Sequence, residues 1–154
     1  MAEPRVGELL DRRAVQLTAR ADDKDHAIWL CGQALLEVGA VAPSYVDSML
    51  ERERSISTFV GEGVAIPHGT LAGKDSVHRD ALCFLRFLDP VDWGDGAAVS
   101  VCIGIAAVGG RHVGILAQLA QILLDPDRAE ALRTATDVDT VLGLLQPSTE
   151  DVTA

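Results

Sequence analysis

Apolar residues in this chain follow the spacing of helices in some segments and of buried strands in others. Spacings of three and four residues predict helices over residues 24–38, 44–54 and 112–124, a further helix that begins at Pro126, and a last one that Asp137 caps. Asp22 and Asp23 are candidate N-caps for the first helix, and Gly39 is a candidate stop. Ser44 and Asp47 resemble a capping box at the start of the second helix.

Strands are predicted between these helices. Short apolar runs indicate strands over residues 14–17, 64–66 and 80–87, and we read the glycine- and hydroxyl-rich segment 55–63 as a loop. Residues 99–107 are almost continuously apolar, as expected for the central strand of a sheet that is covered on both faces. The alternation predicts a single α/β domain with a mixed central sheet of about four or five strands flanked by helices. We expect this domain over residues 9–146, with tails at 1–8 and 147–154.

Composition narrows the classes of function. The 154 residues include 13 Lys and Arg against 23 Asp and Glu, a formal net charge of −10, which opposes binding to a nucleic-acid backbone. The longest apolar run, residues 97–110, is shorter than the roughly 20 residues that cross a bilayer, and charges interrupt the first twenty positions. We therefore expect a cytoplasmic protein with no nucleic-acid partner and no direct membrane insertion. Cys31, Cys83 and Cys102 are widely spaced among apolar neighbours and read as reduced core residues.

The candidate for chemistry is His68, which stands between Pro67 and Gly69 where a predicted strand ends. The proline restricts the backbone before the ring, and the glycine allows a sharp turn and leaves space for a ligand. A neutral imidazole held in this way can act as a nucleophile or base through one nitrogen while the other donates a hydrogen bond. The alternative is an ordinary loop histidine, which composition alone would favour.

A second histidine, His112, opens the helix that follows the predicted central strand. Ligands of α/β proteins bind at this end of the strands, and the unpaired amides of a helix N-terminus favour phosphate. Arg52, at the end of the 44–54 helix, could hold the oxygens of a phosphoryl group, although a charge run of this kind is usually a solvated helix end. We keep that solvated reading for Arg54, leave Arg111 open, and expect the remaining histidines, at 26 and 78, on the surface.

The residues around His68 form a longer pattern, Glu53-x6-Val60-Gly61-x2-Val64-Ala65-Ile66-Pro67-His68-Gly69. This pattern resembles the active-site signature of the mannitol/fructose-type (type 2) enzyme IIA domains of the bacterial phosphoenolpyruvate-dependent sugar phosphotransferase system. The resemblance extends from about residue 9 to residue 145. The stretch 69–75 and the pair Trp93-Gly94 are closer to the mannitol-specific subgroup than to the fructose-type or nitrogen-regulatory ones.

The resemblance implies a function and a set of roles. His68 would accept a phosphoryl group from the phosphohistidine of the carrier HPr and pass it to a cysteine of a IIB domain, with His112 beside it and Arg52 near the phosphoryl oxygens. No metal or other cofactor is implied. Both partners would use one exposed, partly apolar face, for which Phe59, Val60 and Ile66 are candidates, although each could equally belong to the core.

Two alternative functions are compatible with parts of the sequence. A nitrogen-type regulatory IIA module would keep its phosphoryl group as a signal and feed no sugar permease. A metal-dependent hydrolase with His68 and His112 as ligands lacks a third ligand at a familiar spacing.

Overall fold

The computed structural model of the protein describes residues 5–70, 75–109 and 111–145. In chain order the elements are α1 (Val6–Leu9), β1 (Leu10–Ala19), α2 (Lys24–Glu37), α3 (Ser44–Ser55), β2 (Phe59–Gly61), β3 (Val64–Ala65), β4 (Ala81–Gly94), β5 (Ala97–Ala106), α4 (His112–Leu123), α5 (Pro126–Thr134) and α6 (Val138–Leu144). The tails expected at the two ends lie largely outside the described residues. Val6, which we assigned to the N-terminal tail, is buried in α1, and its amide donates to Gln118 Oε1 over 3.0 Å.

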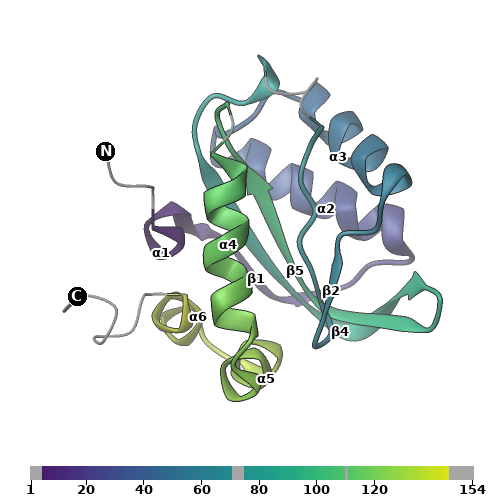
Figure 1. Ribbon diagram of the computed structural model, residues 1–154, viewed down its shortest axis with the longest axis vertical. Coiled ribbons are helices and arrows are strands. Elements are labelled where there is room, and N and C mark those ends of the chain that lie inside the picture. The colour runs from purple at the N-terminus through teal and green to yellow at the C-terminus, as the bar shows by residue number, and fades with distance from the viewer. Residues whose placement is uncertain (1–4, 71–74, 110, 146–154) are drawn as a thin grey trace.

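The strands form one five-stranded mixed sheet in the order β1-β4-β5-β3-β2, which confirms the predicted fold class. β1 is parallel to β4 and β3 is parallel to β5, whereas β4 and β5 form an antiparallel hairpin. α2 and α3 cover one face of the sheet, and α4, α5 and α6 cover the other (Figure 1). β5 is the middle strand, as its continuous apolar run predicted, and residues 101–107 are all buried.

The predicted helices are all present, and three of them have an aspartate at the N-cap. Two of these caps, Asp23 and Asp137, were predicted. The side chains of Asp23, Asp125 and Asp137 accept hydrogen bonds from the first-turn amides of α2, α5 and α6. Gly39 follows α2 with φ +74°, the left-handed conformation that favours glycine after a helix. The capping box predicted for α3 was wrong: Pro43 occupies the cap position, no side chain caps the helix, and the Ser44 hydroxyl bonds instead to Ser76.

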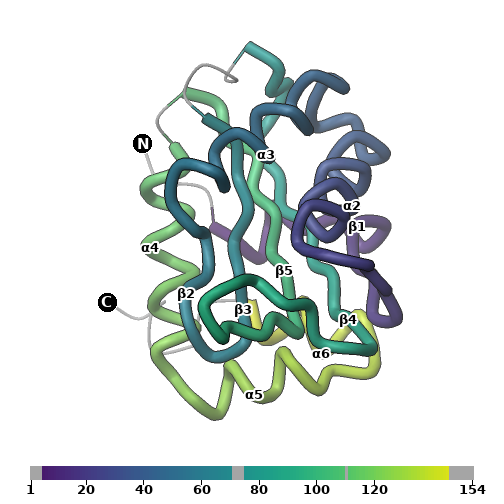
Figure 2. The backbone as a smooth tube through the Cα atoms, turned by 90° about the vertical axis from the view of Figure 1, so that its right-hand side faces the viewer, coloured from purple at the N-terminus to yellow at the C-terminus, as the bar shows by residue number. Residues whose placement is uncertain are grey.

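Three strands differ from the prediction, and one of them, β1, covers Leu10–Ala19 where residues 14–17 were expected. The segment 55–63 contains the edge strand β2, which pairs with β3 through a turn in which Gly61, Glu62 and Gly63 all have positive φ (Figure 2). β4 continues to Gly94, seven residues beyond the predicted end at Phe87. Pro90 lies where the register between β4 and β5 shifts, and a bulge of this kind tolerates a residue that cannot donate to the ladder.

The three cysteines are buried and free, as predicted. They lie in the core between α2 and the β4–β5 hairpin, where Cys83 Sγ is 3.5 Å from the carbonyl oxygen of Cys31. Close packing leaves no room for a side chain at Gly104, since an ideal Cβ there would be 2.6 Å from Cys83 Sγ. These thiols therefore contribute to packing.

Candidate functional site

A pocket of about 590 Å³ opens where β3 and β5 end, and it is lined by His68, His112 and Arg52. The chain leaves β3 at Ala65 and continues along β5, so that Ile105 N donates to the Pro67 carbonyl over 2.9 Å. β5 in turn leads through a short loop into α4, which begins at His112. The sequence predicted these three side chains as site residues, and the topology brings them into one pocket at the carboxyl end of two parallel strands.

The His68 ring is held by a backbone carbonyl of its own loop. His68 Nδ1 is 2.9 Å from the Ile66 carbonyl oxygen, and because a carbonyl can only accept, Nδ1 carries the proton. The other nitrogen, Nε2, then has the lone pair of the neutral ring. No polar side-chain atom of the described residues is both sealed from solvent and without a partner, and no described residue bonds Nε2. Nε2 therefore keeps contact with solvent through the pocket.

His68 is more deeply set than a residue on an open rim, since only 8% of its surface is exposed. Burial lowers the pKa of its imidazole below the ordinary value, because the charged ring loses hydration. The positive charge of Arg52 and the neighbouring His112 lower it further, whereas the bond to Ile66 and the carboxylate of Glu53 act in the opposite direction. The net effect keeps the ring neutral, with the Nε2 lone pair available.

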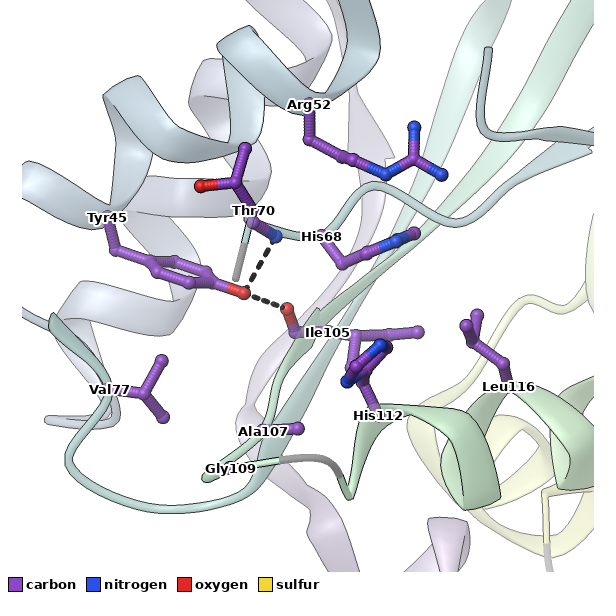
Figure 3. Close-up of a pocket in the computed structure, with 11 residues that line it drawn as sticks. Tyr45, Arg52, His68, Thr70, Val77, Ile105, Ala107, Gly109, His112 and Leu116 are labelled. Atoms are coloured by element: carbon purple, nitrogen blue, oxygen red, sulfur yellow. Dashed lines mark hydrogen bonds between the residues drawn. The ribbon is translucent and has the colours of Figure 1, made fainter. Parts of the chain in front are cut away.

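His112 and Arg52 approach His68 from different elements (Figure 3). The two imidazole rings are nearly parallel, with centroids 6.2 Å apart and an interplanar angle of 24°, within the range in which aromatic rings interact. Arg52 extends from α3, and its Nη1 donates to the Ile56 carbonyl over 2.7 Å. That bond uses one arm of the guanidinium and limits the directions in which the other donors can point.

Tyr45, another residue of the pocket wall, was not predicted from the sequence. Its hydroxyl accepts a hydrogen bond from Gly69 N over 2.8 Å and donates to the Ile105 carbonyl over 2.8 Å (Figure 3). Tyr45 and Arg52 are seven residues apart on α3, a spacing that places both on one face of a helix. That spacing is the signal that could have found Tyr45.

Glu53 departs from the solvated helix end that the charge run suggested. It is 4% exposed, and its carboxylate accepts from Thr58 N over 2.7 Å, from the Thr58 hydroxyl, and from Trp93 Nε1 over 3.3 Å. Lys24 Nζ lies 3.4 Å from the same carboxylate and 5.7 Å from the Trp93 ring centroid. The tip of the β4–β5 hairpin and the start of α2 cover this corner, and no local pattern reveals that cover.

The remaining candidates lie outside the pocket. Arg54 is exposed, as predicted, and so is the histidine at position 78, whereas His26 is only partly exposed. Arg111 pairs with Asp80 at 2.9 Å, and the other Asp80 oxygen accepts from Val108 N over 2.7 Å. This carboxylate thus ties the loop between β5 and α4 to the residue that precedes β4.

Residues 5–70, 75–109 and 111–145 contain no group of three His, Cys, Asp or Glu side chains placed to hold a metal ion. None of the helices in these ranges is long and apolar enough to cross a membrane.

The fold and the pocket define an α/β domain built around a neutral, partly accessible histidine that has a second histidine and an arginine beside it. The family model described as "Phosphoenolpyruvate-dependent sugar phosphotransferase system, EIIA 2" matches residues 8–147, and the chain belongs to this family. The segment 69–75, which we expected to resemble the mannitol-specific subgroup, lies partly outside the described residues, because these leave out 71–74.

Three similar proteins illustrate the relationship. The chain is 40% identical over 137 residues to a "Mannitol-specific phosphotransferase enzyme IIA component" of Halalkalibacterium halodurans, covering 89% of this chain and 94% of that protein. It is 44% identical over 126 residues to a "Multiphosphoryl transfer protein" of Escherichia coli O157:H7, covering 82% of this chain but only 34% of that protein. The chain thus spans about a third of the length of such multiphosphoryl relatives. The solved complex of enzyme IIAMTL and phosphorylated enzyme IIBMTL from Escherichia coli contains a chain that superposes with a TM-score of 0.83 at 34% identity, covering 89% of this chain and 98% of that one.

Proposed function

We propose that this protein is a cytoplasmic phosphoryl carrier of a mannitol-type sugar phosphotransferase system. His68 accepts the phosphoryl group from phosphorylated HPr, and a cysteine of a IIB domain takes it onward. The observation that carries this proposal is the His68 ring itself, whose Nδ1 donates to the Ile66 carbonyl while Nε2 faces the pocket. The mannitol-specific relative, matched over 94% of its length, supports the choice of sugar.

The transfer is an in-line displacement. The Nε2 lone pair of His68 forms a bond to phosphorus while the P–N bond of the donor phosphohistidine breaks and returns its electron pair to the donor ring. The proton on Nδ1 stays in place, and its bond to the Ile66 carbonyl stabilises the positive charge that develops on the ring. Both states are phosphohistidines, so the site must chiefly align the groups and stabilise charge.

Charge stabilisation falls to the neighbours of His68. Arg52 can offer the guanidinium donors that the Ile56 carbonyl leaves unused, and His112 adds a ring donor from the other side of the pocket. No side chain caps α4, so its first-turn amides are also available to an anion that reaches His112. We propose Arg52 and His112 as the groups that hold the phosphoryl oxygens.

The partners dock on the face around the pocket. This face is partly apolar, because three exposed side chains lie beside the pocket. They are Ile56, whose carbonyl accepts from Arg52, and Val108 and Val113, which are next to pocket residues in the chain; they are 67%, 42% and 64% exposed. Of the three candidates that the sequence offers for this face, Val60 is exposed, whereas Phe59 packs partly against the core and Ile66 is buried.

The proposal is tested by incubating the protein with phosphoenolpyruvate, enzyme I and HPr, and locating the phosphoryl group by mass spectrometry. We expect one phosphoryl group on His68, no labelling of His68→Ala, and slower labelling of the folded variants His112→Ala and Arg52→Ala. His26→Ala and His78→Ala are matched controls that should label normally, because both histidines lie outside the pocket. Normal labelling of His68→Ala would overturn the assignment.

A second step separates a transport component from a regulator. Addition of a purified mannitol-type IIB domain should remove the label from His68 within the time that HPr needs to add it. A label that stays on the protein in the presence of IIB domains of the mannitol and fructose types would favour the regulatory alternative.

A further inference from the structure

The backbone on both sides of His68 is tied to a single residue of the central strand. On one side Ile105 N donates to the Pro67 carbonyl over 2.9 Å, and His68 pairs with Ile105 as an isolated parallel bridge. The matching bond of a parallel ladder would join Gly69 N to the Ile105 carbonyl. The Tyr45 hydroxyl lies between these two groups and bonds both, at 2.8 Å each. The backbone that follows His68 is thus held to β5 through the side chain of Tyr45, a residue of α3.

The contact with Tyr45 is tight as well as polar. Tyr45 is 4% exposed, and a Cβ built at Gly69 would lie 2.5 Å from its Cε1 atom and 2.8 Å from Cζ. Only a glycine can let the backbone approach the ring so closely. The position of the Tyr45 ring therefore determines where the chain passes immediately after His68.

α3 supports the next residue of the loop in the same way. Ser48, one turn after Tyr45, accepts a hydrogen bond from Thr70 N over 2.8 Å. Arg52 is one further turn along this helix face. The helix that supplies the arginine to the pocket thus also fixes the loop that carries the histidine, so the two are positioned relative to each other by one rigid element.

We propose that Tyr45 is a positioning residue for phosphoryl transfer: its hydroxyl fixes the Gly69 amide against β5 and so aims His68 Nε2 into the pocket. This inference rests on the carrier function proposed above. Burial raises the pKa of Tyr45 to about 12, so the hydroxyl keeps the proton that it donates to Ile105 throughout the physiological range. Both hydrogen bonds of the Tyr45 hydroxyl are therefore kept throughout that range.

The test is Tyr45→Phe in the full chain, which removes one oxygen and keeps the ring. We expect the rate of phosphoryl transfer from saturating phosphorylated HPr to fall about tenfold or more, because small errors in alignment are costly for in-line transfer. The KM for phosphorylated HPr should not change, since Tyr45 is almost entirely buried. Asp137→Ala, which removes the cap of α6 outside the pocket, is the control for a general loss of stability and should keep the normal rate.

A spectroscopic readout tests the positioning directly and does not depend on the carrier function. In the unmodified protein, NMR should show a slowly exchanging Tyr45 hydroxyl proton with a cross-peak to the Gly69 amide. In Tyr45→Phe the ¹⁵N shifts of the His68 ring should move towards a mixture of tautomers as the bond to Ile66 weakens. The cross-peak measurement uses only the unmodified protein, so it remains valid even if Tyr45→Phe does not fold.

The outcomes are distinct. An unmodified protein that HPr does not label would overturn the carrier function, while the NMR data would still decide the role of Tyr45. A folded Tyr45→Phe that transfers at the normal rate with unchanged His68 shifts would overturn the positioning role. Equal losses of rate in Tyr45→Phe and Asp137→Ala would also overturn it, because they would trace the effect to stability alone.

Discussion

Replacement of Glu53 by alanine tests whether the carboxylate next to Arg52 is a structural anchor. In the folded protein Glu53 accepts hydrogen bonds from both the amide and the hydroxyl of Thr58 and from the Trp93 indole, and it pairs with Lys24. Glu53→Ala leaves these donors without their acceptor in a site where the carboxylate is 4% exposed. Water cannot fully replace the lost carboxylate as a hydrogen-bond acceptor, because the site is almost closed to solvent.

The expected cost follows from the environment of each partner. Removing one member of a buried, hydrogen-bonded ion pair costs ~3–5 kcal/mol of the free energy of unfolding. The Lys24 side chain is 30% exposed, so water can rehydrate part of the ammonium, and we expect the lower end of that range, about 3 kcal/mol. For a protein of this size such a loss lowers the melting temperature by about 6–12 °C.

The measurement is urea and thermal unfolding followed by circular dichroism. Glu51→Ala is the matched control, because it removes a carboxylate from the same charge run of α3 at an exposed position and should change stability by only about 0.5 kcal/mol or less. Glu53→Gln keeps an acceptor for Thr58 and should lie between, at about 1–2 kcal/mol. The reasoning fails if Glu53→Ala is as stable as Glu51→Ala.

Four further results are expected. Because burial lowers the pKa of His68, the initial rate of phosphoryl acceptance should persist as the pH falls through 6.5, the ordinary value for histidine, and a half-maximal rate at or above that pH would contradict this. By the same shift the unfolded chain binds this proton first, so below pH 6.5 the unmodified protein should lose more stability, measured in urea, than His68→Ala does. Gly69→Ala should lower the melting temperature by displacing Tyr45, and an unchanged value would show that the loop can shift freely. The three buried cysteines should react with a thiol reagent only after urea is added, and rapid reaction in the native state would indicate opening of the core.

The elements with long, regular patterns could be predicted from the sequence. The helices α2 and α4 repeat apolar residues over three turns or more, and the run that became β5 is apolar except at Ser100, so its central place in the sheet followed. β2 has only three residues and ends at Gly61, and it is present because it pairs with β3 at the edge of the sheet. The extension of β4 beyond Pro90 pairs with β5 across a tight turn in which Asp95 and Gly96 have positive φ. This Asp-Gly pair is a local hairpin signal that the predicted end at Phe87 did not use.

The candidate site was predictable in its side chains and less so in its supports. His68, Arg52 and His112 were named from a motif and from their positions at the ends of elements, and they line one pocket. Apart from Thr58, the hydrogen-bond partners of Tyr45 and Glu53 are 24 to 60 residues away in the chain, so only the folded structure reveals those contacts. Glu53 was already fixed in the motif, but its burial depends on a tryptophan 40 residues later.

The support of the site rests on backbone groups, and this has a consequence for the proposed chemistry. His68 is located by the Ile66 carbonyl, which accepts from Nδ1, and by its two neighbours in the chain. The Pro67 carbonyl accepts from Ile105 N, and the Gly69 amide is linked to the Ile105 carbonyl through the Tyr45 hydroxyl. The same strand end leads into α4 and therefore also sets the position of His112. None of these ties uses Nε2, so a phosphoryl group can bind to and leave that atom without breaking a bond that holds the loop. A carrier that must present one geometry to two partners in turn requires this separation between the atom that reacts and the groups that position it.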